Sequence, residues 1–203
     1  MHAIVFKKLG HRIYVLEKSS EDTLQSQAAG LQAGQEVQKF IDKYVKIDRP
    51  YSMTPAKNII EVLNKEGEII NCFAVGITMH LTTWNILFEL FKSNLVNEQS
   101  SSYVLYETDK LVQDVSYDGD KVSVAYLDNK TGIRSVLRAD LVIAADGSHS
   151  TVRRTVMPEI TPKYVGYVTW RGSVTESSVS DASREVLQDR VLFFRAEGSF
   201  AVS

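Results

Sequence analysis

Glu17 is the first residue in this 203-residue sequence whose type and position could bind a cofactor. It ends the stretch 12–17, which is apolar through its centre and rich in β-forming residues, as a buried parallel strand tends to be. In a dinucleotide-binding βαβ unit, an acid at the end of the second strand hydrogen-bonds a ribose hydroxyl, about 20 residues after a glycine fingerprint. That position falls before Met1, so we expect the fingerprint to lie outside this chain. The alternative is that Glu17 is simply a solvent-facing acid.

A second acid, Asp146, ends the apolar stretch 140–147 together with Gly147. We expect this stretch to be a strand that carries Asp146 to a cofactor crevice, followed at once by the start of a helix. Gly147 would let a ligand approach the backbone closely, and the free N–H groups of the helix start would favour a phosphate. Arg153 would add a cationic fork for a phosphate or a neighbouring carboxylate. The alternative is that Asp146 only caps the helix.

The elements around these residues alternate between helical and extended patterns. Apolar residues at helical spacing predict helices over 2–10, 35–44 and 84–94. Alternating apolar residues and turn signals, such as the Asp-Gly pair at 118–119, predict several strands. The predicted strands cover 12–17, 53–63, 68–73, a meander over 111–138, 140–147, 163–171 and 190–195. The order predicts an α/β fold with antiparallel β insertions, in which the first strand of the dinucleotide-binding sheet is missing.

Composition excludes several classes of function. Lys and Arg number 23 against 25 Asp and Glu, so the net charge is −2, and there is no basic tract to neutralise nucleic acid or an anionic membrane. No apolar run approaches the roughly 18 residues that a membrane span needs. The start of the chain lacks the pattern of a signal peptide, so we expect a cytosolic protein. A single cysteine, Cys72, excludes an intramolecular disulfide and a cysteine-built zinc site. The four histidines are scattered, which argues against a histidine-rich metal site.

The stretch 140–153 resembles the Asp-Gly motif of FAD-dependent aromatic-ring monooxygenases, the group that includes p-hydroxybenzoate, salicylate and dihydroxypyridine hydroxylases. Trp84 stands where the family's helix usually begins with an Arg near the flavin, a departure associated with a fungal subgroup. Other segments resemble, in the same order, the family's first helix and ribose-binding strand, the loop approaching the flavin, the helix at Trp84 and the strand opening the substrate domain. These segments are 2–17, 25–31, 82–87 and 165–172.

The resemblance implies a Rossmann-like FAD domain over 1–157 and the start of a substrate-binding domain over 158–203. It implies FAD as cofactor, NAD(P)H as co-substrate, and O2 and a small aromatic substrate as partners, with no nucleic acid. In such enzymes the flavin supplies the chemistry and the protein supplies binding and orientation. No residue is identified as catalytic. The residues implied to serve the cofactors are Glu17, Gln27, Gly30, Asp146, Gly147 and Arg153.

The sequence also departs from this family. The glycine-rich pyrophosphate loop expected at the front and the second, Gly-Asp flavin motif expected at the back are absent, so the sequence resembles a monooxygenase truncated at both ends. The alternative function is therefore a non-catalytic remnant, either a partner-binding module or an inactive gene product. Three other residues favour ordinary roles. His149 lacks a catalytic partner at recognisable spacing, Trp170 is expected in a core, and Cys72 is expected to be buried.

Overall fold

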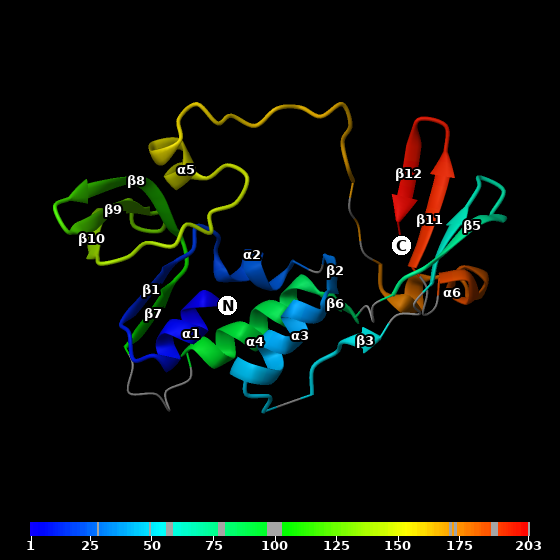
Figure 1. The fold of residues 1–203 in the computed structure, drawn as a ribbon, viewed down its shortest axis with the longest axis horizontal. Helices are drawn as coiled ribbons and strands as arrows, with labels where there is room; N and C mark the ends of the chain where they lie inside the picture. Colours follow the sequence, from blue (N-terminus) through cyan, green and yellow to red (C-terminus); the bar gives the residue numbers. More distant parts are fainter. Residues whose placement is uncertain are drawn as a thin grey trace.

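The computed structural model describes residues 1–27, 29–48, 50–55, 59–76, 80–96, 103–170, 172, 174–187 and 191–202. Figure 1 shows helices α1, α3 and α4 in the centre, a β-meander on one side and the sheet that contains the last strands of the chain on the other. The helices are α1 (His2–Lys8), α2 (Glu21–Gln25), α3 (Gln35–Tyr44), α4 (Trp84–Val96), α5 (Thr151–Val156) and α6 (Asp181–Leu187), with a 3₁₀ turn over Glu176–Ser178. The described strands are β1 (Ile13–Leu16), β2 (Gly30–Ala33), β3 (Thr54–Pro55), β4 (Ile59–Leu63), β5 (Ile69–Ala74), β6 (His80–Thr83), β7 (Val104–Glu107), β8 (Lys110–Asp118), β9 (Lys121–Asp128), β10 (Arg134–Ala139), β11 (Val191–Ala196) and β12 (Ser199–Val202).

Strand β1 pairs in parallel with β7, a strand that the sequence reading did not predict. The predicted first helix and strand are confirmed as α1 and β1, and the chain turns between them at Gly10, whose φ is +85°. The buried Lys7 of α1 donates hydrogen bonds to the carbonyl oxygens of Asn94 and Leu95, at 3.3 and 2.8 Å, in the last turn of α4. This contact ties α1 to the helix that follows β6, because these carbonyls have no partner within their own helix.

The predicted helices 35–44 and 84–94 are confirmed as α3 and α4. The second continues to Val96, because Asn94 does not stop it but uses its side chain to donate to the carbonyl oxygens of Leu90 and Lys46. Phe40 of α3 meets Phe91 of α4 edge-on, with ring centroids 5.7 Å apart. Next to this contact, Ile41 is fully buried. The two helices therefore share an apolar interface of the kind their sequence spacing predicts.

The meander over 111–138 is confirmed as the antiparallel sheet β8–β9–β10. Its predicted tight turn lies at Gly119, which has φ +67° between the last residue of β8 and the first of β9. Val122 and Val124 are two residues apart, so they lie on the same face of β9 and form a buried cluster with Val115 of β8. This cluster is the core against which the following segment packs.

The predicted strand over 140–147 is wrong. No residue from 140 to 147 belongs to a strand, although the helix expected after it is present as α5. Val142 packs on the valine cluster, but Leu141 and Ile143 remain exposed. A strand forms only where a neighbouring strand supplies hydrogen-bond partners, and within the described residues none pairs with this segment. Apolar composition alone therefore did not produce a strand.

The predicted strand over 163–171 is also wrong for its described part. Residues 163–170 pair with no described strand, and Figure 1 shows this segment as an extended trace between α5 and the four-stranded sheet. Trp170, expected in a core, is 93% exposed, and Arg171 lies outside the described residues. Alternating apolar residues favour a strand only if one face is covered, and here both faces are open.

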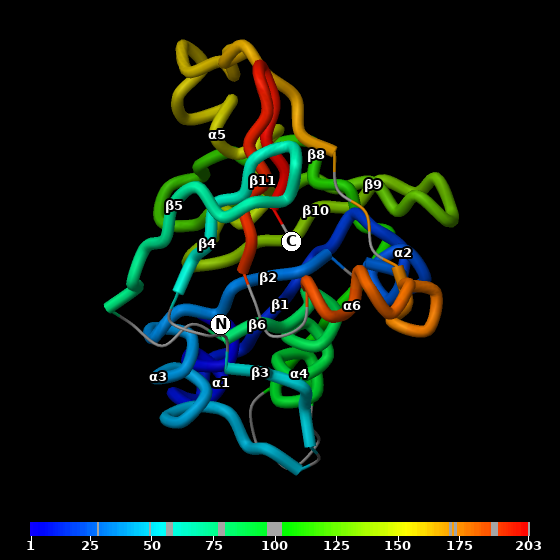
Figure 2. The backbone as a smooth tube through the Cα atoms, turned by 90° about the vertical axis from the view of Figure 1, so that its right-hand side faces the viewer, coloured from blue at the N-terminus to red at the C-terminus, as the bar shows by residue number. Residues whose placement is uncertain are grey.

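The four-stranded sheet joins segments that are far apart in the sequence. Strand β11 pairs in parallel with β4 and in antiparallel with β12, while β4 also pairs with β5. Figures 1 and 2 both show the last two strands beside β4 and β5. Leu192 of β11 is almost fully buried, whereas Cys72 of β5 is exposed, which corrects the expectation that it is buried. Within the described residues, no helix is long and apolar enough to cross a membrane.

The first prediction concerns Asp128, at the end of β9. Its carboxylate accepts from the Lys110 ammonium at 2.8 Å and from the backbone N–H groups of Lys130 and Thr131. These contacts, the Lys110 hydrogen bond first, lower the pKa of Asp128 to about 2. Because this pKa lies below that of an unfolded Asp, about 3.9, the ionised group stabilises the fold above pH 4, and this stabilisation is lost as the pH falls toward 2. Asp128→Asn should therefore lower the urea midpoint at pH 7 and reduce its fall between pH 4 and pH 2.5.

The matched control is Asp114→Asn, which changes an exposed carboxylate of the same sheet that forms no ion pair among the described residues. Its urea midpoints should follow those of the unchanged chain. Equal acid sensitivity in the Asp128→Asn variant and the unchanged chain would contradict the assignment.

Candidate functional site

Glu17 lies at the edge where the two parallel strands β1 and β7 end together. Its backbone N–H donates to the carbonyl of Glu107 at 2.8 Å, and its own carbonyl accepts from Lys110 N–H at 2.8 Å. The half-buried carboxylate accepts from the backbone N–H of Ser19 through Oε1 at 2.7 Å. No other hydrogen bond or ion pair to a described residue is made by this carboxylate. Glu17 therefore has a fixed backbone and one carboxylate oxygen open to a hydroxyl donor.

A cluster of aromatic and charged side chains adjoins this edge, and the sequence reading missed it. The Lys92 ammonium of α4 lies over the rings of Phe88 and Tyr106, 5.4 and 5.3 Å from their centroids, and pairs with Glu21 of α2. Burial, followed by the negative charges of Glu17, Glu21 and Glu89, raises the pKa of Tyr106 to about 12. Tyr106 is therefore a neutral phenol at physiological pH. The spacing of Phe88 and Lys92 by four residues was a visible signal, but the partner strand β7 was not predicted.

Trp84 extends the same cluster. Its ring stacks on Phe88 with the centroids 4.8 Å apart and the ring planes 13° apart. Trp84 is half-buried on the face it shares with Phe88, as its helical spacing predicts. Its main role here is packing at the start of α4.

Asp146 caps the start of α5. Its carboxylate accepts from the Ser150 hydroxyl at 2.5 Å and from the backbone N–H groups of Thr151 and Val152 at 2.7 and 3.2 Å. Burial acts to raise the pKa of Asp146, but these hydrogen bonds outweigh it and hold the pKa below its usual value. Both carboxylate oxygens are thus used within the loop, as the capping alternative predicts.

Gly147 and Arg153 hold the same loop in place. Gly147 has φ +77°, a backbone conformation that favours glycine. The Arg153 guanidinium donates to the carbonyl oxygen of Gly147 at 3.5 Å and to that of Ser148. The cationic fork that the sequence predicts is therefore built into the loop itself, with the buried Nε–H of Arg153 left without a partner.

The structure brings the Glu17 edge and the Asp146 loop onto one core. Leu16, directly before Glu17, packs against the valine cluster of the meander, and so do Val142 and Val152 on either side of Asp146. The sheet β8–β9–β10 is thus a common platform for two well-separated segments that the sequence predicts to bind the cofactor.

Gly30 begins a strand of a different sheet, and Gln27 lies in the loop between α2 and that strand. Gly30 begins β2 and pairs with Thr83 of β6, and the Trp84 N–H donates to the carbonyl of Ala29 at 2.9 Å. Gln27 is exposed, and the space where a Cβ at Gly30 would lie is open. Among the described residues, no hydrogen bond or ion pair joins this region to Asp146. The region of Gln27 and Gly30 is connected to the Glu17 edge through helix α2, whose Glu21 forms an ion pair with Lys92 of α4.

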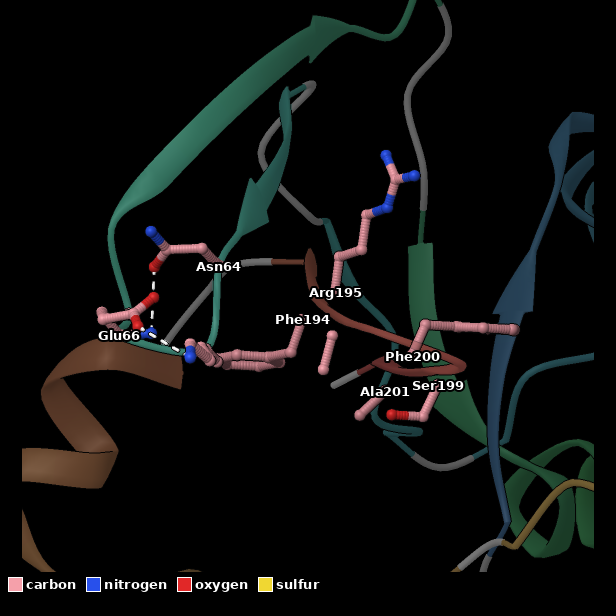
Figure 3. Close-up of a pocket in the computed structure, with 10 residues that line it drawn as sticks. Asn64, Glu66, Phe194, Arg195, Ser199, Phe200 and Ala201 are labelled. Carbon is pink, nitrogen blue, oxygen red and sulfur yellow. Dashed lines mark hydrogen bonds and ion pairs between the residues drawn. The ribbon is translucent and has the colours of Figure 1, made fainter.

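A separate concavity of about 470 Å³ lies between the β4–β5 turn and the β11–β12 hairpin (Figure 3). Its side chains do not converge, since Phe194, Arg195 and Phe200 point in three different directions. In the described part of the chain, no group of three or more His, Cys, Asp or Glu residues could hold a metal ion. We therefore place the candidate site at the Glu17 edge and the Asp146 loop.

Comparison with known proteins identifies the class. Residues 1–201 match the family described as FAD binding domain. The chain therefore belongs to the FAD-binding domain family of flavoproteins, as the resemblance of its motifs predicts.

Curated relatives narrow the comparison to aromatic-ring monooxygenases. The chain is 33% identical over 88 residues to 2,6-dihydroxypyridine 3-monooxygenase of Paenarthrobacter nicotinovorans, covering 43% of this chain and 21% of that protein. It is 45% identical over 60 residues to 3-amino-4-hydroxybenzoate 2-monooxygenase of Streptomyces cremeus, covering 30% of this chain and 14% of that protein.

The fold is similar to that of 2,6-dihydroxypyridine-3-hydroxylase from Arthrobacter nicotinovorans, with a TM-score of 0.64 and 22% sequence identity. This match covers 91% of the chain and 49% of that structure. The chain thus spans about half the length of that solved relative, and its alignments cover smaller shares of the curated ones.

The described residues fit FAD at the Glu17 edge. An acid with one open oxygen, fixed where two parallel strands end, suits a ribose hydroxyl. The Asp146 carboxylate offers no open oxygen, so it contributes by shaping its loop. The orphaned Nε–H of Arg153 is a buried donor that still needs an acceptor.

Loss of the Asp146 cap gives the second prediction. Asp146→Ala should lower the free energy of unfolding by about 1–2 kcal/mol, because substituting a helix-capping acceptor has this cost. It should also speed hydrogen exchange at the amides of Thr151 and Val152, measured by NMR. Glu159→Ala, at an exposed acid that forms no ion pair among the described residues, is the control and should leave both quantities unchanged. Unaltered exchange at these two amides in the Asp146 variant would show that Asp146 does not cap the helix.

Proposed function

We propose that this protein is a flavoprotein monooxygenase that hydroxylates an aromatic or similar small organic substrate with FAD, NAD(P)H and O2. The observation that carries the proposal is the open carboxylate oxygen of Glu17 at the shared edge of β1 and β7, in a chain that belongs to the FAD-binding domain family. The two curated relatives are ring monooxygenases, which supports the reaction class.

Each proposed cofactor-binding residue has a specific task. Glu17 would accept a hydrogen bond from the adenosine ribose, and Gln27 and Gly30 would line the approach to the flavin. Asp146 and Arg153 would hold the loop around Gly147 in the shape that borders the cofactor. FAD, when bound, supplies the transfer of electrons from NAD(P)H to O2 and of one oxygen atom to the ring. The protein binds and orients the reactants and excludes water.

The proposed division of the chain places the FAD-binding domain at 1–157 and the start of the substrate-binding domain at 158–203. Strand β11 of the second part pairs with β4 of the first, so the two parts would share one sheet. We further propose that the protein acts in the cytoplasm on small molecules. Its nearly balanced charge supports this proposal, because nothing in it favours a nucleic-acid partner.

The third prediction tests the role of Glu17 in the protein expressed from its complete reading frame. That protein should purify with FAD and oxidise NAD(P)H faster when an aromatic substrate is added. Glu17→Gln should weaken FAD binding about tenfold or more, because it removes the charge from a hydrogen bond whose loss costs about 1.5–3 kcal/mol. Fluorescence titration of the apoprotein with FAD measures this change.

The control for this experiment is Glu197→Gln, which alters an exposed acid in the β11–β12 turn and should not change FAD affinity. FAD affinity that is equal in the Glu17→Gln variant and the unchanged protein would remove Glu17 from the cofactor site. A protein that binds no FAD and oxidises no NAD(P)H would instead favour the non-catalytic remnant.

A further inference from the structure

Asp109 adopts an unusual backbone conformation next to the Glu17 edge. Its φ is +60°, and within the described residues no other non-glycine residue has a positive φ. This left-handed conformation is costly for most side chains, although aspartate and asparagine tolerate it better than the others. Asp109 lies in the two-residue connection between β7 and β8, and it is buried. A strained residue that is buried beside a candidate site points to a task that requires its conformation.

Two backbone N–H groups at this connection donate to the turn that follows β1. The N–H of Asp109 donates to the carbonyl oxygen of Ser19 at 3.1 Å, and the N–H of Lys110 donates to that of Glu17 at 2.8 Å. Both bonds depend on the path that the backbone takes through Asp109. Ser19 then donates its own N–H to Oε1 of Glu17 at 2.7 Å. Asp109 therefore holds the residue whose amide contacts the Glu17 carboxylate.

The turn between β9 and β10 holds Asp109 in this conformation. The Lys130 ammonium lies 3.0 Å from Oδ2 of Asp109, and the Asp109 side chain is only 12% exposed. The N–H of Asn129 donates to the carbonyl oxygen of Asp109 at 2.8 Å. Asp128 fixes the backbone of Lys130 by accepting from its N–H at 2.8 Å. Because the Asp109 carboxylate is shielded from water, its ion pair is screened less than one between two exposed groups.

We propose that Asp109 is a positioning residue for the carboxylate of Glu17. It acts through Ser19, because its left-handed conformation, secured by Lys130, keeps the Ser19 amide on one carboxylate oxygen of Glu17. The other oxygen is thereby turned toward the ligand. Asp109 itself is buried and paired, so it does not contact the ligand. Its effect on FAD binding rests on the proposed function, whereas its control of the Ser19 amide does not.

The fourth prediction tests this control by NMR on the apoprotein with serine-selective labelling. Asp109→Ala should move the Ser19 amide proton upfield and speed its hydrogen exchange, because alanine tolerates the left-handed conformation poorly. Asp109→Asn should change both quantities less, because asparagine tolerates this conformation as aspartate does. The matched control is Asp120→Ala, at an exposed aspartate of the β8–β9 turn that forms no ion pair among the described residues. It should leave the Ser19 amide unchanged.

Lys130→Met provides a second variant that is unlikely to disturb folding, since the Lys130 side chain is 67% exposed. It removes the ion pair with Asp109 and leaves the aspartate in place. The Ser19 amide should shift in the same direction as in Asp109→Ala, by a smaller amount. An unchanged Ser19 amide in this variant would overturn the assigned role of Lys130.

The effect on the cofactor is measured by fluorescence titration of the apoprotein with FAD, in the protein expressed from its complete reading frame. Asp109→Ala should raise the Kd for FAD about threefold or more, a smaller change than direct loss of the Glu17 charge. In the Glu17→Ala background, the same substitution should change the Kd by less than about twofold, because it acts through that carboxylate. A substitution that only loosened the fold would add its effect to that of Glu17→Ala.

Three results would overturn the proposal. These are a Ser19 amide that is the same in Asp109→Ala and the unchanged protein, equal disturbance by Asp109→Asn and Asp109→Ala, and additive effects of Asp109→Ala and Glu17→Ala on the Kd. Absence of FAD binding in the unchanged protein would contradict the proposed function instead, and the Ser19 amide would still decide whether Asp109 positions it. Thermal midpoints measured alongside confirm that each variant remains folded.

Discussion

The parallel pairing of β1 with β7 is the constraint on which the candidate site depends. Parallel strands end at the same edge, so the turn that follows β1 meets the turn that follows β7. Three backbone hydrogen bonds then join the two turns. The N–H groups of Glu17, Lys110 and Asp109 donate to the carbonyl oxygens of Glu107, Glu17 and Ser19 respectively. Glu17 is thereby fixed at the edge by backbone contacts, which leaves part of its carboxylate free to bind a ligand.

The meander sheet supports this edge from the other side. Its valine cluster is covered by Leu16 before Glu17 and by Val142 and Val152 around Asp146. Burial of these apolar side chains is non-directional and follows the area removed from water. It brings the two segments together, while directional hydrogen bonds set the shape of each one. The Asp146 loop, in which Asp146 accepts from Ser150 and Arg153 donates to the carbonyl oxygen of Gly147, is the clearest example.

Charged groups in this structure serve two distinct purposes. Lys92 lies between aromatic rings and pairs with Glu21, so its charge joins α2, α4 and β7. Arg153 and Arg154 donate to neutral carbonyl oxygens of their own loop, so they hold the loop in shape. The difference lies in the partner, because a neighbouring carboxylate neutralises a cation whereas a carbonyl only orients it.

The sequence by itself determined α1, α3, α4 and the meander, because each carries its own periodic apolar face or its own turn residues. It also identified Glu17 and the Asp146 motif, since the ends of apolar stretches are visible without a fold. Tertiary structure decided the rest. Strand β7 formed because β1 offered a partner, whereas 140–147 and 163–170 did not form strands because no described strand pairs with them. Strand pairing depends on neighbours distant in sequence, so local pattern could not settle it.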